Sequence, residues 1–195
     1  QTDPNWGQKF EQLGTILPTP NSTRTASGAP GKAYWQQRAD YKIQITLDDQ
    51  SQQITGNERI TYFNQSPDDL EYLWLQLDQN FRAQDSDTPL VTESNMLDSL
   101  SAKDLFAYVN DFDGGFKIQK ITNAGGADMD YVINKTMMRI NLDEPLISGD
   151  SIVFNIDWNY NINDRMSQKG RSGYEYFPED DNYSYTIAQF YPRMA

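Results

Sequence analysis

The chain has 195 residues, of which 37% are hydrophobic and 23% are charged, and it contains neither histidine nor cysteine. These two absences exclude Ser-His-Asp triads, Cys-His pairs, disulfides and zinc held by His or Cys within these residues. A net charge of −12 argues against nucleic acid as a partner, and the lack of any apolar run of membrane-spanning length argues against membrane insertion.

The first 38 residues, 1–38, are expected to form an extended leader. Apolar positions are sparse there, and runs of turn-forming residues occupy 18–23 and 27–31. An alternative is that a short helix packs the first part of the leader onto the domain through five apolar side chains: Trp6, Phe10, Leu13, Ile16 and Leu17. From residue 39 the pattern changes, and one β-domain is expected over 39–195.

Three strands are predicted at the start of this domain. Residues 41–47 alternate strictly, and a second alternating run at 53–64 follows a polar turn, so the two are expected to pair as antiparallel neighbours. In the run 70–77, Leu73, Leu75 and Leu77 face one way, whereas Tyr72 and Trp74 face the other. Apolar groups on both faces predict a central strand.

The remaining elements are less regular. A run similar to a capping box at 101–104 predicts one short helix around 94–108. Shorter strands are expected at 116–122, 131–133 and 138–142. Residues 152–162 keep one period of alternation and predict a long central strand. Residues 163–182 show no period, and 183–190 are expected to form a last strand.

Together these elements predict an all-β fold of mostly antiparallel sheets, arranged like a saddle or a sandwich. Alternation along each strand puts every second side chain on the same face of its sheet. The core is therefore expected at the inward positions of the runs, namely Ile43, Ile45, Ile60, Leu73, Leu75, Ile140, Phe154, Ile156 and Trp158.

Three groups of side chains are candidates for a site. Asp111 and Asp113 precede two glycines as in part of a calcium loop, but the later Glu of an EF-hand is missing, so a turn is favoured. The carboxylates at 179–181 are of the kind that bind a cation or hydrolyse a glycoside, although acidic loops are more often simply solvated. The tyrosines from 174 to 185 suit a sugar ring or a protein surface.

Several runs, in order, resemble the aminopeptidase N family of zinc metallopeptidases. They are Y-K-I-Q-I-T-L-D at 41–48, I-T-G-N-E-R-I-T-Y-F-N at 54–64 and L-E-Y-L-W-L-Q-L-D at 70–78. The run L-I-S-G-D-S-I-V-F-N-I-D-W-N at 146–159 is similar to a turn and long strand of that family. The run at 185–194 resembles the family's T-Q segment, with Ala188 in place of Thr. The likeness covers residues 39–195.

This resemblance implies a β-domain that packs over a thermolysin-like catalytic domain. It also implies that Gln189 and Tyr191 bind the amino terminus of a peptide substrate. Gln189 matches the family's Gln, whereas Tyr191 stands where the family has Gln or Glu. The family's H-E-x-x-H zinc motif and its G-x-M-E-N motif do not occur here. Zinc and the catalytic residues are therefore expected in a domain that follows Ala195, with no cofactor in this chain.

The leading hypothesis is thus a non-catalytic domain of a bacterial zinc aminopeptidase that is exported to the periplasm or the cell exterior. Its expected partners are its own catalytic domain and the amino terminus of the peptide substrate. One alternative is a stand-alone β-sandwich module that binds carbohydrate or protein through the tyrosine-rich segment. A small carboxylate-based hydrolase is the third and least favoured reading.

Overall fold

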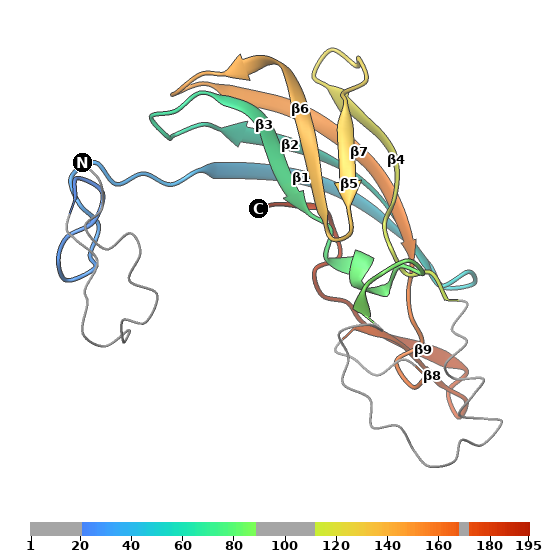
Figure 1. The fold of residues 1–195 in the computed structure, drawn as a ribbon. Coiled ribbons are helices and arrows are strands. Elements are labelled where there is room, and N and C mark those ends of the chain that lie inside the picture. Colours follow the sequence, from blue (N-terminus) through green and yellow to red (C-terminus); the bar gives the residue numbers. More distant parts are fainter. Residues whose placement is uncertain (1–20, 89–111, 168–171) are drawn as a thin grey trace. The chain divides into compact units, whose positions relative to one another are not determined.

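The computed structural model describes residues 21–88, 112–167 and 172–195 (Figure 1). The chain divides into two compact units, Gln1–Gln37 and Arg38–Ala195. The described part of the first unit is a hydrogen-bonded loop. The Asn21 Oδ1 atom accepts hydrogen bonds from the backbone N–H groups of Thr23 and Arg24, and Arg24 forms a β-bridge with Pro30.

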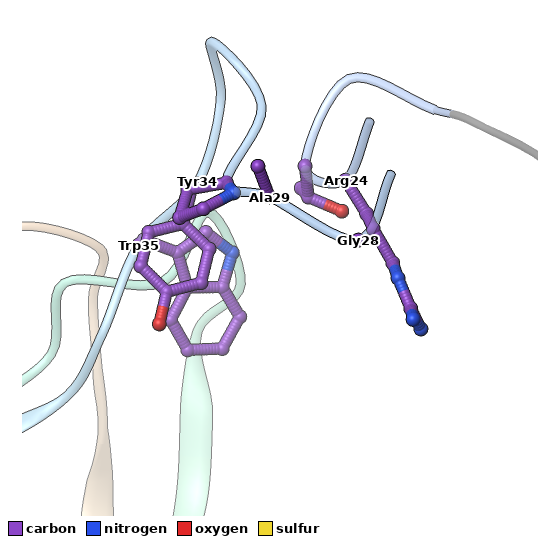
Figure 2. Close-up of a pocket in the computed structure, with 7 residues that line it drawn as sticks. Arg24, Gly28, Ala29, Tyr34 and Trp35 are labelled. Carbon is purple, nitrogen blue, oxygen red and sulfur yellow. The ribbon is translucent and has the colours of Figure 1, made fainter. Parts of the chain in front are cut away.

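This loop surrounds an open pocket of about 540 Å³. Figure 2 shows the rings of Tyr34 and Trp35 on one side of the pocket and Arg24 on the other. The described residues that line it are Thr23, Arg24, Gly28, Ala29, Pro30, Tyr34 and Trp35, and none of these carries a carboxylate.

The second unit begins with a four-stranded antiparallel sheet in the order β1-β2-β7-β4 (Figure 1). Its strands are β1 (Arg38–Asp48), β2 (Gln53–Phe63), β7 (Ser151–Asn161) and β4 (Lys117–Asn123). The predicted pairing of the first two strands is confirmed, with Tyr41 opposite Ile60. The prediction that the long run near 152–162 is a central strand is also confirmed, because β7 lies between β2 and β4.

A second four-stranded antiparallel sheet has the order β10-β3-β6-β5. Its strands are β10 (Arg193–Met194), β3 (Leu70–Gln76), β6 (Met137–Leu146) and β5 (Tyr131–Asn134). A short 3-10 helix, η1 (Asp78–Arg82), follows β3, and β8 (Gly173–Phe177) pairs with β9 (Asn182–Thr186) as a separate ribbon. The all-β prediction is confirmed. The helix expected around 94–108 lies outside the described residues. Of the helices that the described ranges contain, none is long and apolar enough to cross a membrane.

Side chains from both four-stranded sheets form one buried cluster. Seven of the nine predicted core residues are buried: Ile60, Leu73, Leu75, Ile140, Phe154, Ile156 and Trp158. Ile43 is half-buried, and the prediction for Ile45 is wrong, since 51% of its surface is exposed. Because β1 is an edge strand, its inward face is covered less and less towards the turn at 49–52, so period alone overstated the burial of Ile45.

Two predictions for the last third of the chain are also corrected. Residues 163–182, which show no period, contain the five-residue strand β8. The last alternating run stops early, because β9 ends at Thr186 rather than at Phe190. The chain then makes an irregular turn before the two-residue strand β10 pairs with β3. This turn contains both residues that the family resemblance points to.

Candidate functional site

The irregular turn after β9 holds Gln189 in an uncommon backbone conformation. Its φ is 52°, in the left-handed region that non-glycine residues seldom adopt. The residue is exposed, so no tight packing of its side chain forces this conformation. A strained backbone persists only where its surroundings determine it, and such positions gather at functional sites. The hydrogen bonds made by the neighbouring backbone are therefore expected to hold Gln189 in this conformation.

Those hydrogen bonds come mainly from Gln79, a buried residue of η1 that is only 3% exposed. Its Nε2 atom donates to the backbone oxygens of Ala188, at 2.9 Å, and Gln189, at 3.1 Å. The Oε1 atom of Gln79 accepts from Arg82 Nη1 at 3.1 Å, which fixes the orientation of the amide. On the other side, the N–H of Ala188 donates to Ser172 Oγ. The turn is thus held from two directions while the Gln189 side chain remains at the surface.

The end of the chain is fixed to the second sheet by Arg193. Its Nε atom lies 2.7 Å from Asp78 Oδ2, and its Nη2 atom donates to Gln76 Oε1 at 2.7 Å. The hydrogen bond with Asp78 is the main reason that the pKa of Arg193 is raised. The backbone N–H of Met194 donates to the hydroxyl of Tyr41 on β1, which ties the same segment to the first sheet.

Tyr191 is placed differently from Gln189. Its side chain is half-buried and packs edge-on against two rings, Tyr41 at 5.3 Å and Phe190 at 5.1 Å between centroids. The structure therefore brings the two candidate residues into one turn, but only Gln189 is exposed. Because the Tyr191 ring packs against two other rings, its side chain is less free than that of Gln189 to reach a ligand.

A glutamine amide offers a carbonyl oxygen that can accept hydrogen bonds and an NH₂ group that can donate them, and it does not titrate. Gln189 can therefore accept from an ammonium group or bind a peptide backbone, but it cannot act as a general base. Within the described ranges, no group of three or more His, Cys, Asp or Glu side chains is placed to hold a metal ion. The described residues therefore offer no such group of ligands to a zinc ion.

The described acidic candidates lie in loops or turns of the chain. Asp113 forms an ion pair with Lys117 and accepts a hydrogen bond from the N–H of Gly115, as in a local turn. Asp111 lies outside the described residues. The carboxylates at 179–181 are all exposed and lie in the turn between β8 and β9. None of them has the buried environment that tunes a carboxylate for acid or base catalysis.

One unusual carboxyl group was missed in the sequence. Glu58 on β2 is fully buried, and neither of its oxygens has a hydrogen-bond partner among the described residues. Burial raises the pKa of Glu58 to about 9, so the group is protonated at neutral pH. The signal was present in the sequence, because position 58 falls in phase with the inward residues Ile54, Ile60 and Tyr62.

No family model and no curated protein matches this chain. Its fold is similar to that of the M1 zinc metallopeptidase from Deinococcus radiodurans, with a TM-score of 0.40 and 12% identity over 70% of this chain. A mutant of a two-domain M1 zinc metallopeptidase bound to L-tryptophan is similar over 64% of this chain, with a TM-score of 0.39 and 11% identity. This chain covers 24% and 21% of those chains, about a quarter of their length.

Proposed function

We propose that residues 39–195 are the non-catalytic amino-terminal β-domain of a zinc aminopeptidase that works outside the cytosol. In this proposal the domain covers the active-site cleft of a following catalytic domain, which supplies the zinc and the catalytic residues. The turn at 187–192 faces the cleft, where Gln189 accepts a hydrogen bond from the ammonium group of the substrate and Tyr191 forms an adjoining wall.

The observation that carries this proposal is the state of Gln189. Its backbone has a left-handed φ of 52° and is clasped by the buried Gln79, yet its side chain is exposed. A clasp of this kind positions a polar group towards a partner outside the domain. The sequence runs that resemble the aminopeptidase N family support the same reading, because those at 41–48, 54–64, 70–78 and 146–159 contain most of β1, β2, β3 and β7.

The test uses the full-length enzyme carrying Gln189→Ala. A hydrogen bond between a neutral amide and a charged ammonium contributes about 1.5–3 kcal/mol. At about 1.4 kcal/mol per factor of ten, its loss lowers kcat/KM by roughly 10- to 100-fold. Steady-state kinetics with an aminoacyl anilide measures the change, and circular dichroism checks that the fold is retained.

Gln44→Ala is the matched control, because Gln44 is also an exposed glutamine and lies on the polar face of β1. This variant is expected to keep the wild-type kcat/KM. If Gln189→Ala also kept the wild-type value, the proposed role of Gln189 would be wrong. The proposed domain assignment would be wrong if the parent protein lacked an H-E-x-x-H motif after Ala195.

A further inference from the structure

The ribbon of β8 and β9 carries four tyrosines on one face. Tyr174 pairs with Tyr185 and Tyr176 pairs with Tyr183, so all four side chains point to the same side of the ribbon. Tyr183 touches the other three, with centroid distances of 5.8 Å to Tyr174, 5.0 Å to Tyr176 and 6.2 Å to Tyr185. We call these four residues the tyrosine face.

The two halves of the tyrosine face differ in exposure. Tyr174 and Tyr185 are half-buried and pack against the core, and the Tyr185 hydroxyl donates to Gln52 Oε1 at 2.8 Å. Tyr176 and Tyr183 are 45% and 37% exposed. The inner half therefore anchors the ribbon, while the outer half presents two aromatic rings at the surface. Exposed neighbouring aromatic rings are typical of binding surfaces.

Carboxylates from three separate segments of the chain raise the pKa of tyrosine hydroxyls on this face. Asp181 Oδ1 accepts a hydrogen bond from the Tyr176 hydroxyl at 2.7 Å, and this bond is the main cause that raises the pKa of Tyr176. Burial is the main cause that raises the pKa of Tyr174 and of Tyr185. The charge of Asp164 raises the first of these further, and the charge of Asp49 raises the second.

Among the described lysines and arginines, none contributes to the pKa shift of Tyr174, Tyr176 or Tyr185. The stretch 172–192 contains four acidic residues and neither lysine nor arginine. The faces of aromatic rings are also negative and attract cations. The tyrosine face therefore combines an apolar surface with a negative potential, which matches a ligand that is both basic and able to lie flat on the rings.

We propose that the tyrosine face is a docking surface for a polypeptide segment rich in lysine and arginine, outside this chain. The basic side chains lie over the exposed rings of Tyr176 and Tyr183, with Asp181 next to them. Arginine suits the face best, since its planar guanidinium stacks on a ring and is weakly hydrated. A neutral saccharide would also stack on the rings and could donate hydrogen bonds to the carboxylates, but it would lack the charge–charge attraction that a basic segment gains from them. This surface is independent of the proposed function of Gln189.

The test measures binding of the 195-residue chain to fluorescent peptides by anisotropy. The basic probe is an octapeptide of alternating Arg and Gly, and the neutral probe has Gln in place of each Arg. The basic peptide is expected to bind, and higher salt is expected to weaken it. Tyr176→Ala with Tyr183→Ala should weaken binding by roughly fivefold to tenfold, because two cation–π contacts are lost.

Tyr72→Ala is the matched control, because Tyr72 is also a tyrosine with 45% exposure, on β3. It is expected to leave binding unchanged. A second variant, Tyr176→Phe with Asp181→Asn, keeps both rings and removes one carboxylate, so the ribbon is retained and binding should fall by about twofold to threefold. Equal binding of the neutral and basic peptides, or an equal loss in Tyr72→Ala, would overturn the proposal. Binding of maltohexaose in place of the basic peptide would overturn it in favour of a sugar-binding module.

Discussion

At the scale of single residues, Gln189 and Glu58 are both unusual, the first in its backbone conformation and the second in the burial of its side chain. Gln189 is polar and exposed, but its backbone is strained. Glu58 has ordinary strand pairing, opposite Ile43 and Ile156, but its carboxyl group is buried without a hydrogen-bond partner among the described residues. The first departure affects a binding site, whereas the second affects the pH dependence of stability.

Glu58 makes the folded state less stable as the pH rises. Its pKa is raised from 4.5 to about 9 on folding, because burial penalises the charged form. Below about pH 4.5 both states hold the proton, and Glu58 adds no pH dependence to the stability. Between 4.5 and 9 the unfolded chain ionises while the folded chain keeps its proton, so stability falls by up to about 1.4 kcal/mol per pH unit from this group.

Glu58→Gln removes this titration. We expect the free energy of unfolding of the variant, measured by urea denaturation from pH 5 to pH 9, to fall less steeply with pH than that of the wild type. The difference in free energy of unfolding between the variant and the wild type should therefore shift in favour of the variant as the pH rises. Glu144→Gln is the control, since Glu144 is exposed on β6. Parallel curves for Glu58→Gln and the wild type would show that Glu58 is not buried as a neutral acid.

At the scale of elements, the sequence predicts a strand well where one face of that strand meets the core along its whole length. β7 is such a strand, because its buried residues alternate without a break from Phe154 to Tyr160. Alternation predicts burial less well at the end of β1, where Ile45 and Leu47 are exposed. It misses β8, because the alternation there is limited to Tyr174 and Tyr176 before Phe177 and Pro178 interrupt it.

The candidate site was only partly predictable for a related reason. The resemblance of the run at 185–194 to a known segment pointed to Gln189 and Tyr191. It could not reveal the clasp by Gln79, because that hydrogen bond joins residues 110 positions apart. Such a contact depends on how β3 and the last turn meet, and no local pattern contains this information. The same holds for the contact between Tyr185 and Gln52.

The two hydrogen bonds from Gln79 to the backbone of the last turn predict a specific effect for Gln79→Ala. Two backbone oxygens of the last turn would lose their donor, and Arg82 would lose its contact with Gln79. Losing hydrogen bonds around a buried amide costs about 1–3 kcal/mol. We therefore expect a lower free energy of unfolding in urea, and faster amide hydrogen exchange at 188–190 than in the wild type.

Gln53→Ala is the comparison for this experiment. Gln53 also donates a hydrogen bond from its side chain, to Asn161 Oδ1, but this bond is exposed. Its loss is expected to change stability by less than about 0.5 kcal/mol. If Gln79→Ala were no more destabilising than Gln53→Ala, or left exchange at 188–190 unchanged, the turn would not depend on the clasp.

At the scale of the whole molecule, both proposed binding surfaces belong to the last part of the chain. Buried apolar side chains from the two four-stranded sheets form one cluster. The turn at 187–192 and the tyrosine face both lie after β7 in the sequence, and both are anchored to the body by side chains from far along the chain: Gln79 in one case and Gln52 in the other. The body therefore acts as a scaffold for the last part of the chain.

A scaffold of this kind is expected to bind no zinc tightly and to hydrolyse no aminoacyl anilide on its own. The chain has no His or Cys, and carboxylates alone favour harder cations than zinc. Isothermal calorimetry of the 195-residue chain with zinc should show no stoichiometric binding at micromolar affinity. In the anilide assay, a preparation free of contaminating peptidase should not exceed the buffer blank. The full-length parent is the positive control, since the proposed function places both zinc and turnover there. Tight zinc binding by the 195-residue chain would mean that carboxylates outside the described residues form a metal site. Turnover by this chain would contradict its assignment as a non-catalytic domain.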